Sequence, residues 1–122
     1  MSDLAPVFTA LAGIMRRHAR GLDFKQDTAS DLYVDTHHVQ KNRKPLWFGG
    51  VQIRKKYVSY HLMPVYVEPA LLKGISMGLK ARMQGKSCFN FASADPELFR
   101  ELANLAAAGI AYYRKQDFVQ AD

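Results

Sequence analysis

Apolar residues recur every three or four positions along two segments of the chain, residues 4–18 and 96–113. This spacing places them on one face of an α-helix, so an amphipathic helix is expected near each end of the sequence. Asp95 and Pro96 suit the N-cap and the first position of the second helix. Residues 69–83 carry a shorter helical pattern interrupted by glycines, which predicts one helix or two short ones.

Between the helical segments, apolar and polar residues alternate over short stretches, which is the pattern of half-buried β-strands. The polar segments between these stretches predict loops. The expected strands are residues 32–36, 46–53, 57–63 and 87–91, and the expected loops include residues 22–30 and 37–44.

The two central stretches form an antiparallel hairpin if Arg54 lies opposite Tyr57. In this register Val51 lies opposite Tyr60, on an apolar face that also includes Trp47. The other face is mixed in character and would be partly solvated, as in a sheet that is covered on one side only. A shift of one residue would exchange the two faces, so the pattern favours this register.

These elements predict an α+β fold for residues 1–122 as a single domain, with the element order α-β-β-β-α-β-α. We expect an antiparallel sheet of about four to five strands that is covered on one face by the N- and C-terminal helices. No apolar run approaches the roughly 18 residues needed to cross a membrane, and the first residues lack the basic region of a secretory signal. The single cysteine suits the reducing cytoplasm.

The chain is basic, with 17 Lys and Arg residues against 11 Asp and Glu residues and a formal charge of +6. A positive domain attracts anionic partners such as phosphorylated metabolites, acidic proteins or nucleic acid. Many of the basic residues fall in expected loops, where solvated charge is ordinary. The charge therefore favours a small anionic ligand or a protein partner, and nucleic acid stays open as an alternative.

The residues that could carry metal or nucleophilic chemistry show no recognised spacing. Motifs such as HxxxH and CxxC are absent, so neither a metal site nor a cofactor is predicted. Cys88 and His61 could share one face of the sheet with Asp35, which keeps a cysteine-dependent enzyme open as an alternative. An inert, partly buried cysteine is the simpler interpretation, and no catalytic residue is assigned.

The mixed face of the predicted sheet, called the outer face below, is the candidate binding surface. Aromatic rings and hydrogen-bonding groups converge there, two glycines leave space beside them, and basic residues follow nearby. A homodimer could also form through this face. The candidate ligand-binding residues are Tyr33, Phe48, Gln52, Ser59, His61, Cys88 and Asn90, with Lys80, Arg82 and Lys86 as the neighbouring cations.

Three segments resemble the YdhG-like family of small bacterial proteins, most of which have no known function. The segments are residues 45–50 (PLWFGG), 57–64 (YVSYHLMP) and 85–91 (GKSCFNF). The resemblance implies an α+β fold similar to that of frataxin, and it implies iron delivery for at least one branch of the family.

Frataxins carry an acidic first helix and edge that bind iron. This chain differs, because its first helix carries Arg16, Arg17, His18 and Arg20. Hard cations need clustered carboxylates, and the only loose acidic group here is Asp23, Asp27, Asp31 and Asp35. We therefore expect a non-catalytic domain that binds a ligand or partner. An iron chaperone and a nucleic-acid-binding module are the alternatives.

Overall fold

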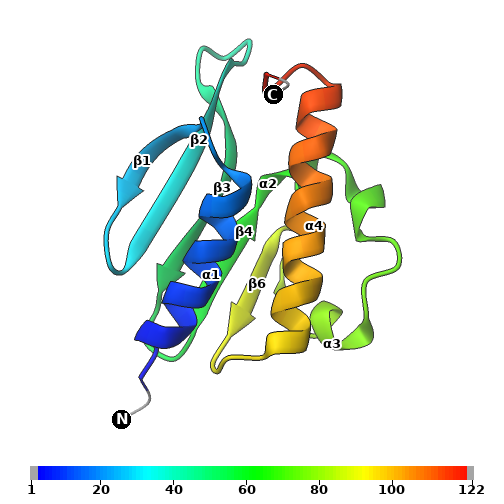
Figure 1. The fold of residues 1–122 in the computed structure, drawn as a ribbon. Coiled ribbons are helices and arrows are strands. Elements are labelled where there is room, and N and C mark those ends of the chain that lie inside the picture. Colours follow the sequence, from blue (N-terminus) through cyan, green and yellow to red (C-terminus); the bar gives the residue numbers. More distant parts are fainter. Residues whose placement is uncertain (1–2, 121–122) are drawn as a thin grey trace.

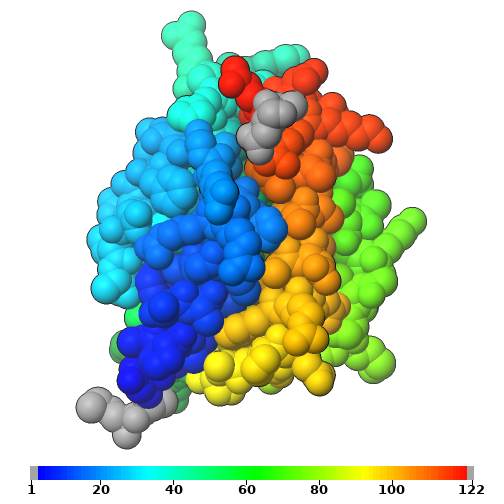
Figure 2. All heavy atoms as spheres, viewed as in Figure 1, coloured from blue at the N-terminus to red at the C-terminus, as the bar shows by residue number. Residues whose placement is uncertain are grey.

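The computed structural model describes residues 3–120, which form a six-stranded antiparallel sheet with two long helices on one face. The strand order is β1-β2-β3-β4-β6-β5. Figure 1 shows helices α1 and α4 side by side in front of the sheet, and Figure 2 shows their side chains closing over that face. The predicted α+β class and the one-sided cover by the terminal helices are confirmed, and the sheet has one or two strands more than expected.

The bounds of the elements are as follows. The helices are α1 (Ala5–His18), α2 (Met63–Val67), the 3₁₀ helix η1 (Pro69–Leu72), α3 (Met77–Lys80) and α4 (Pro96–Lys115). The strands are β1 (Asp23–Asp27), β2 (Asp31–Val39), β3 (Pro45–Ile53), β4 (Val58–Leu62), β5 (Met83–Gln84) and β6 (Cys88–Phe91).

Helices α1 and α4 form where the spacing of apolar residues predicts them. Leu11 and Met15 of α1 and Leu102 of α4 are completely buried against the sheet. Burial of a large apolar side chain contributes about 1.5–3 kcal/mol, so these faces fix the position of both helices. Asp95 caps α4 as expected, because its Oδ1 accepts a hydrogen bond from the backbone N–H of Leu98 at 3.2 Å.

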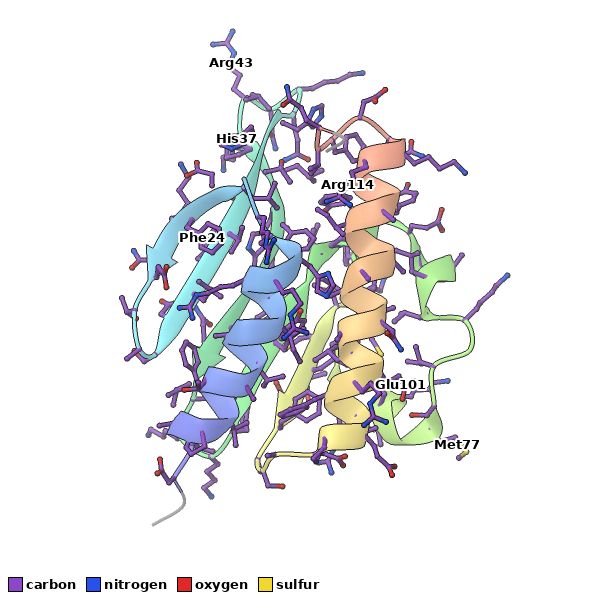
Figure 3. The ribbon with its side chains drawn as sticks, in the orientation of Figure 1. Phe24, His37, Arg43, Met77, Glu101 and Arg114 are labelled. Atoms are coloured by element: carbon purple, nitrogen blue, oxygen red, sulfur yellow. The ribbon has the colours of Figure 1, made fainter. Side chains whose placement is uncertain are left out.

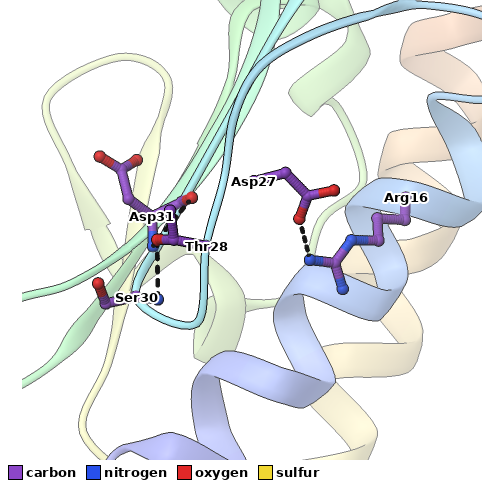
Figure 4. Close-up of polar contacts among 5 residues, drawn as sticks. All are labelled: Arg16, Asp27, Thr28, Ser30 and Asp31. Carbon is purple, nitrogen blue, oxygen red and sulfur yellow. Dashed lines mark hydrogen bonds and ion pairs between the residues drawn. The ribbon is translucent and has the colours of Figure 1, made fainter.

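The expectation of a loop over residues 22–30 is wrong, because most of this segment forms the edge strand β1. Its polar residues are tolerated since an edge strand faces water on one side. Asp27 pairs with Arg16 of α1, and Thr28 Oγ1 accepts hydrogen bonds from the N–H groups of Ser30 and Asp31 in the turn to β2 (Figure 4). The ion pair and the turn together join the first helix to the edge of the sheet.

The predicted register of the central hairpin is confirmed. Val51 lies opposite Tyr60 and Ile53 opposite Val58, and the Arg54 N–H donates to the Tyr57 carbonyl at 2.8 Å. Val51, Val58 and Tyr60 are all fully buried under the helices. Strand β2 is longer than expected, since residues 37–39 continue the pairing instead of forming a loop.

A β-bulge at Phe48 in β3 reverses two predicted side-chain positions. Val34 of β2 pairs with Gly49, but the next residue, Asp35, pairs with Trp47, so Phe48 is the extra residue. Phe48 therefore faces the helices, is fully buried and contacts the Tyr113 ring edge-on. The predictions of Phe48 on the outer face and Trp47 in the core are both wrong.

Gly49 is required beside this bulge. A Cβ atom at residue 49 would lie 2.4 Å from the carbonyl oxygen of His61 and 2.7 Å from Met15 Cε. Neither backbone nor a buried side chain can yield by that amount, so only glycine permits the close approach of β4 and α1 here.

The segment between β4 and β6 crosses from the sheet to the helix layer in short elements. Helix α2 and strand β5 are additional to the predicted elements, and residues 69–83 hold two short helices, η1 and α3, which is the second of the two expected alternatives. The N–H and Oγ of Ser76 each donate to the Glu101 carboxylate of α4 at 2.6 Å, which fixes α3 against α4 (Figure 3). Over residues 3–120, no helix is both long and apolar enough to cross a membrane.

Candidate functional site

The outer face carries a row of rings that runs across the middle of the sheet. Four residues lie opposite one another on neighbouring strands: Tyr33 of β2, Gly50 of β3, His61 of β4 and Cys88 of β6. Gly50 has no side chain, and the ring of Trp47 occupies the space above it, with Cζ2 3.5 Å from where a Cβ would lie. The bulge at Phe48 thus places the Trp47 ring above Gly50, the member of the row that lacks a side chain.

The rings of this row contact one another. The centroids of Tyr33 and Trp47 are 5.3 Å apart with an interplanar angle of 16°, which is a stacked arrangement, and those of Trp47 and His61 are 5.4 Å apart at a tilt of 39°. Trp47 therefore lies between Tyr33 and His61 and contacts both rings.

A second, polar row lies next to the rings, and the guanidinium of Arg54 contacts an inner member of this row. Asp31, Gln52, Ser59 and Asn90 are aligned on four neighbouring strands. Gln52 Nε2 donates to Asp31 Oδ1 at 3.3 Å, and Arg54 Nη2 donates to Gln52 Oε1 at 2.7 Å. Arg54 was not among the predicted site residues, although its spacing of two from Gln52 places it on the same side of the strand.

Cys88 and His61 approach each other as neutral groups. The Cys88 sulfur lies 3.7 Å from His61 Nε2, and its thiol donates to Asn90 Oδ1 at 3.4 Å. Burial raises the pKa of Cys88, while burial and the charge of Arg54 lower the pKa of His61. A neutral thiol beside a neutral imidazole is not an activated nucleophile, since catalysis needs the thiolate. Asp35 lies opposite Trp47 and does not orient the imidazole.

Two buried polar atoms of the outer face have no hydrogen-bond partner among residues 3–120. They are Trp47 Nε1 and Ser59 Oγ. An unsatisfied buried polar group costs about 1–3 kcal/mol, so any rearrangement or ligand that supplies partners is favoured by that amount. Both atoms lie close to the ring row, one within it and one in the neighbouring polar row.

The predicted cations are distributed differently from the expectation. Arg82 takes the register position beside Asn90, whose N–H donates to the Arg82 carbonyl at 2.8 Å. Lys86 Nζ lies 5.9 Å from the centroid of the exposed Tyr66 ring, which draws it toward α2. Lys80 belongs to α3, which packs on α4 in the helix layer, so it does not border the outer face. Arg54, which contacts Gln52, is a cation of this face that the prediction did not include.

Of the four aspartates of the loose acidic group, only Asp23 and Asp35 lie opposite each other on neighbouring strands. Asp27 pairs with Arg16 on the helix side, Asp23 pairs with Lys25 at 2.8 Å, and Asp31 accepts from Gln52. Burial, followed by the charge of neighbouring Asp23, raises the pKa of Asp35 even though Lys25 opposes the shift. Across the described part of the chain, no three His, Cys, Asp or Glu residues come together as metal ligands.

Comparison with known proteins gives no relative: no protein-family model, curated protein or solved structure matches this chain. The resemblance of residues 45–50, 57–64 and 85–91 to YdhG-like proteins therefore stays a prediction.

Proposed function

We propose that this chain is a non-catalytic binding domain whose outer face takes a small anionic ligand with an aromatic or other planar body. The observation that carries the proposal is the row of contacting rings Tyr33, Trp47 and His61, which lies within reach of the Arg54 charge, since that charge lowers the pKa of His61. The anionic group would lie near Arg54 and the Asn90 amide, and the body would lie along the rings. We place this domain in the cytoplasm, which suits its single cysteine.

Single-stranded nucleic acid fits this surface less well. Proteins that bind single strands on a sheet offer the flat faces of aromatic rings to the bases. Here Trp47 lies between Tyr33 and His61, so neighbouring rings already pack against it. The acidic side chains of Asp31 and Asp35 lie on the same face and would repel an extended run of phosphates.

A homodimer through the outer face is also less favoured. The six strands contain 34 residues, which at ~3.3 Å along each strand and ~4.8 Å between strands give a face of roughly 540 Å². Stable interfaces bury about 800 Å² on each partner. The face is therefore smaller than two copies of the chain need, whereas it exceeds the needs of a small ligand.

Calorimetric titration with phenylphosphate tests the proposal, with neutral benzyl alcohol as the uncharged probe. We expect phenylphosphate to bind and benzyl alcohol to bind at least tenfold more weakly. Arg54→Gln should weaken phenylphosphate binding about tenfold, because a hydrogen bond to a charged group contributes ~1.5–3 kcal/mol.

Lys55→Gln is the matched control for this experiment. Lys55 is exposed, lies next to Arg54 in the same turn and carries the same charge. Its loss should change the affinity less than twofold. Equal weakening by both substitutions would mean that phenylphosphate senses only the net charge, and the proposed ligand position near Arg54 would then be wrong.

A further inference from the structure

A second concave region lies away from the outer face, at the end of the molecule where α1 and α4 finish. The tip of the β2–β3 hairpin and the C-terminal residues meet at this end in Figure 1. A polar hollow of about 460 Å³ is formed there by Arg20, His37, His38 and the segment 117–120, with Gly21 and Leu22 beneath them. None of these residues belongs to the ring row or the polar row.

An apolar hollow of about 500 Å³ adjoins the polar one. It is lined by Leu46, Val67 and Phe118, and its rim is formed by residues 40–42. His38 and Phe118 border both hollows, and their rings are in contact with centroids 4.8 Å apart. The two hollows are therefore neighbours that share His38 and Phe118, and one has a polar lining while the other has an apolar lining.

The His37 ring has a fixed orientation in the polar hollow. Its Nε2 lies 2.9 Å from the Gly21 carbonyl oxygen, which can only accept, so Nε2 carries the hydrogen. His37 and His38 both line the polar hollow although they are neighbours on β2, whose pairing with β3 is irregular between Asp35 and Val39. Figure 3 shows His37 at this end of the sheet.

The charge at this end is positive. Lys41, Arg43 and Lys44 are exposed on the hairpin tip, and Arg20 contributes to the polar hollow itself. Figure 3 shows Arg43 extending away from the body of the molecule. Asp117 is the one carboxylate among the described residues that line the polar hollow. Basic residues near helix C-termini offset the helix dipoles, but the three on the hairpin tip have no helix end to compensate.

Exposed apolar side chains gather at the same end. Val39 is 60% exposed and Val67 37% exposed, and Tyr66 next to Val67 is 52% exposed. Exposed apolar groups rimmed by charge are typical of binding sites. An isolated phosphate or carboxylate would leave these groups in water, whereas a ligand with an apolar part would cover some of them.

We propose that this end of the molecule binds an amphiphilic anion, such as a fatty acid. Its oxyanion head occupies the polar hollow near Arg20 and His37, and its apolar tail lies along Leu46, Val67 and Phe118. The volumes fit, because small-molecule sites measure about 300–1,000 Å³. This site is separate from the outer face and does not rest on the proposed function.

Calorimetry with octanoate tests this site, with octan-1-ol as a tail without charge and inorganic phosphate as a head without tail. We expect octanoate to bind and each partial probe to bind at least tenfold more weakly. Arg20→Gln should weaken octanoate binding about tenfold, as expected for one lost charge-assisted contact. Val67→Ser should also weaken octanoate binding. Because Val67 is partly exposed, we expect this variant to fold.

Arg17→Gln is the matched control, because Arg17 is exposed in the last turn of α1, three residues before Arg20 in the turn that follows, and does not line the hollow. It should change octanoate affinity less than twofold. Equal weakening by Arg17→Gln and Arg20→Gln would overturn the site, and so would phosphate binding as tightly as octanoate. Binding to vesicles of phosphatidylglycerol without binding to octanoate would replace the hollow with a membrane-docking surface.

The fluorescence of Trp47 distinguishes a failure of the proposed octanoate site from a failure of the proposed outer-face site. Trp47 is the single tryptophan of the chain and lies on the outer face. Octanoate in the hollow should leave the indole fluorescence and the effect of Arg54→Gln unchanged. A change in Trp47 emission on octanoate binding would place the fatty acid on the outer face instead.

Discussion

The reactivity of the Cys88 thiol depends on its burial and on three neighbouring side chains. Asn90 accepts its hydrogen, His61 lies beside its sulfur, and Arg54 acts on it through charge. Burial raises the pKa of Cys88 more than Arg54 lowers it, so the thiol is neutral at pH 7. The sequence predicted that Cys88 and His61 share a face, but it could not predict their protonation, which depends on burial.

Removal of the Arg54 charge should move two pKa values in the same direction. Arg54 lowers the pKa of both His61 and Cys88, so Arg54→Gln should raise both. The pH profile of iodoacetamide alkylation reports Cys88, and the imidazole proton shifts in NMR report His61. Alkylation at a given pH below the thiol pKa should be slower in the variant, because less thiolate is present.

Lys55→Gln again serves as the control, since it removes an equal charge from the same turn. It should leave both titration curves close to those of the unmodified chain. If Arg54→Gln lowered either pKa, the electrostatic description of the outer face would be incorrect.

At the scale of elements, the bulge in β3 has the largest effect on the site. The alternation of residues 49–53 predicted the hairpin register correctly, because glycine, valine and glutamine differ clearly in polarity. It could not place the bulge, because Trp47 and Phe48 are adjacent aromatic residues and either one suits the core. Only the pairing with β2, which is distant in sequence, shows that Phe48 is the extra residue.

The stability of two aromatic variants tests the bulge. Phe48→Ala should lower the free energy of unfolding by about 3–5 kcal/mol, because Phe48 is fully buried against Tyr113. Tyr33→Ala should cost only about 1 kcal/mol, because Tyr33 is half-buried on the outer face. Urea denaturation measures both values. Similar losses for the two variants would contradict the placement of Phe48 in the core.

The two strands that the sequence did not predict, β1 and β5, lie at the edges of the sheet. Strand β1 contains Asp23, Lys25, Gln26 and Asp27, which is a composition typical of a loop. It forms a strand because β2 offers free hydrogen-bonding groups, and its polar side chains face water or pair with α1. Strand β5 has only two residues, which is too short for any alternation to be recognised.

At the scale of the whole molecule, two amphipathic helices cover one face of the sheet and leave the other as a surface of rings and polar groups. The sequence predicts this asymmetry because the periodicities of helices and strands are both visible in it. It does not predict the hollows near the chain end, because His37 and Phe118 are brought together only by the fold. The proposed ligand site on the outer face depends on the asymmetry, and the proposed fatty-acid site depends on the hollows.

The most direct test of the central claim is the fluorescence of Trp47 during titration with phenylphosphate, excited at a wavelength the probe does not absorb. Because the chain has one tryptophan, its emission reports the outer face alone. We expect a saturable change in emission with the same midpoint as the calorimetric titration, shifted about tenfold in Arg54→Gln. Calorimetric binding without any change in Trp47 emission would place the ligand elsewhere and contradict the assignment of the outer face.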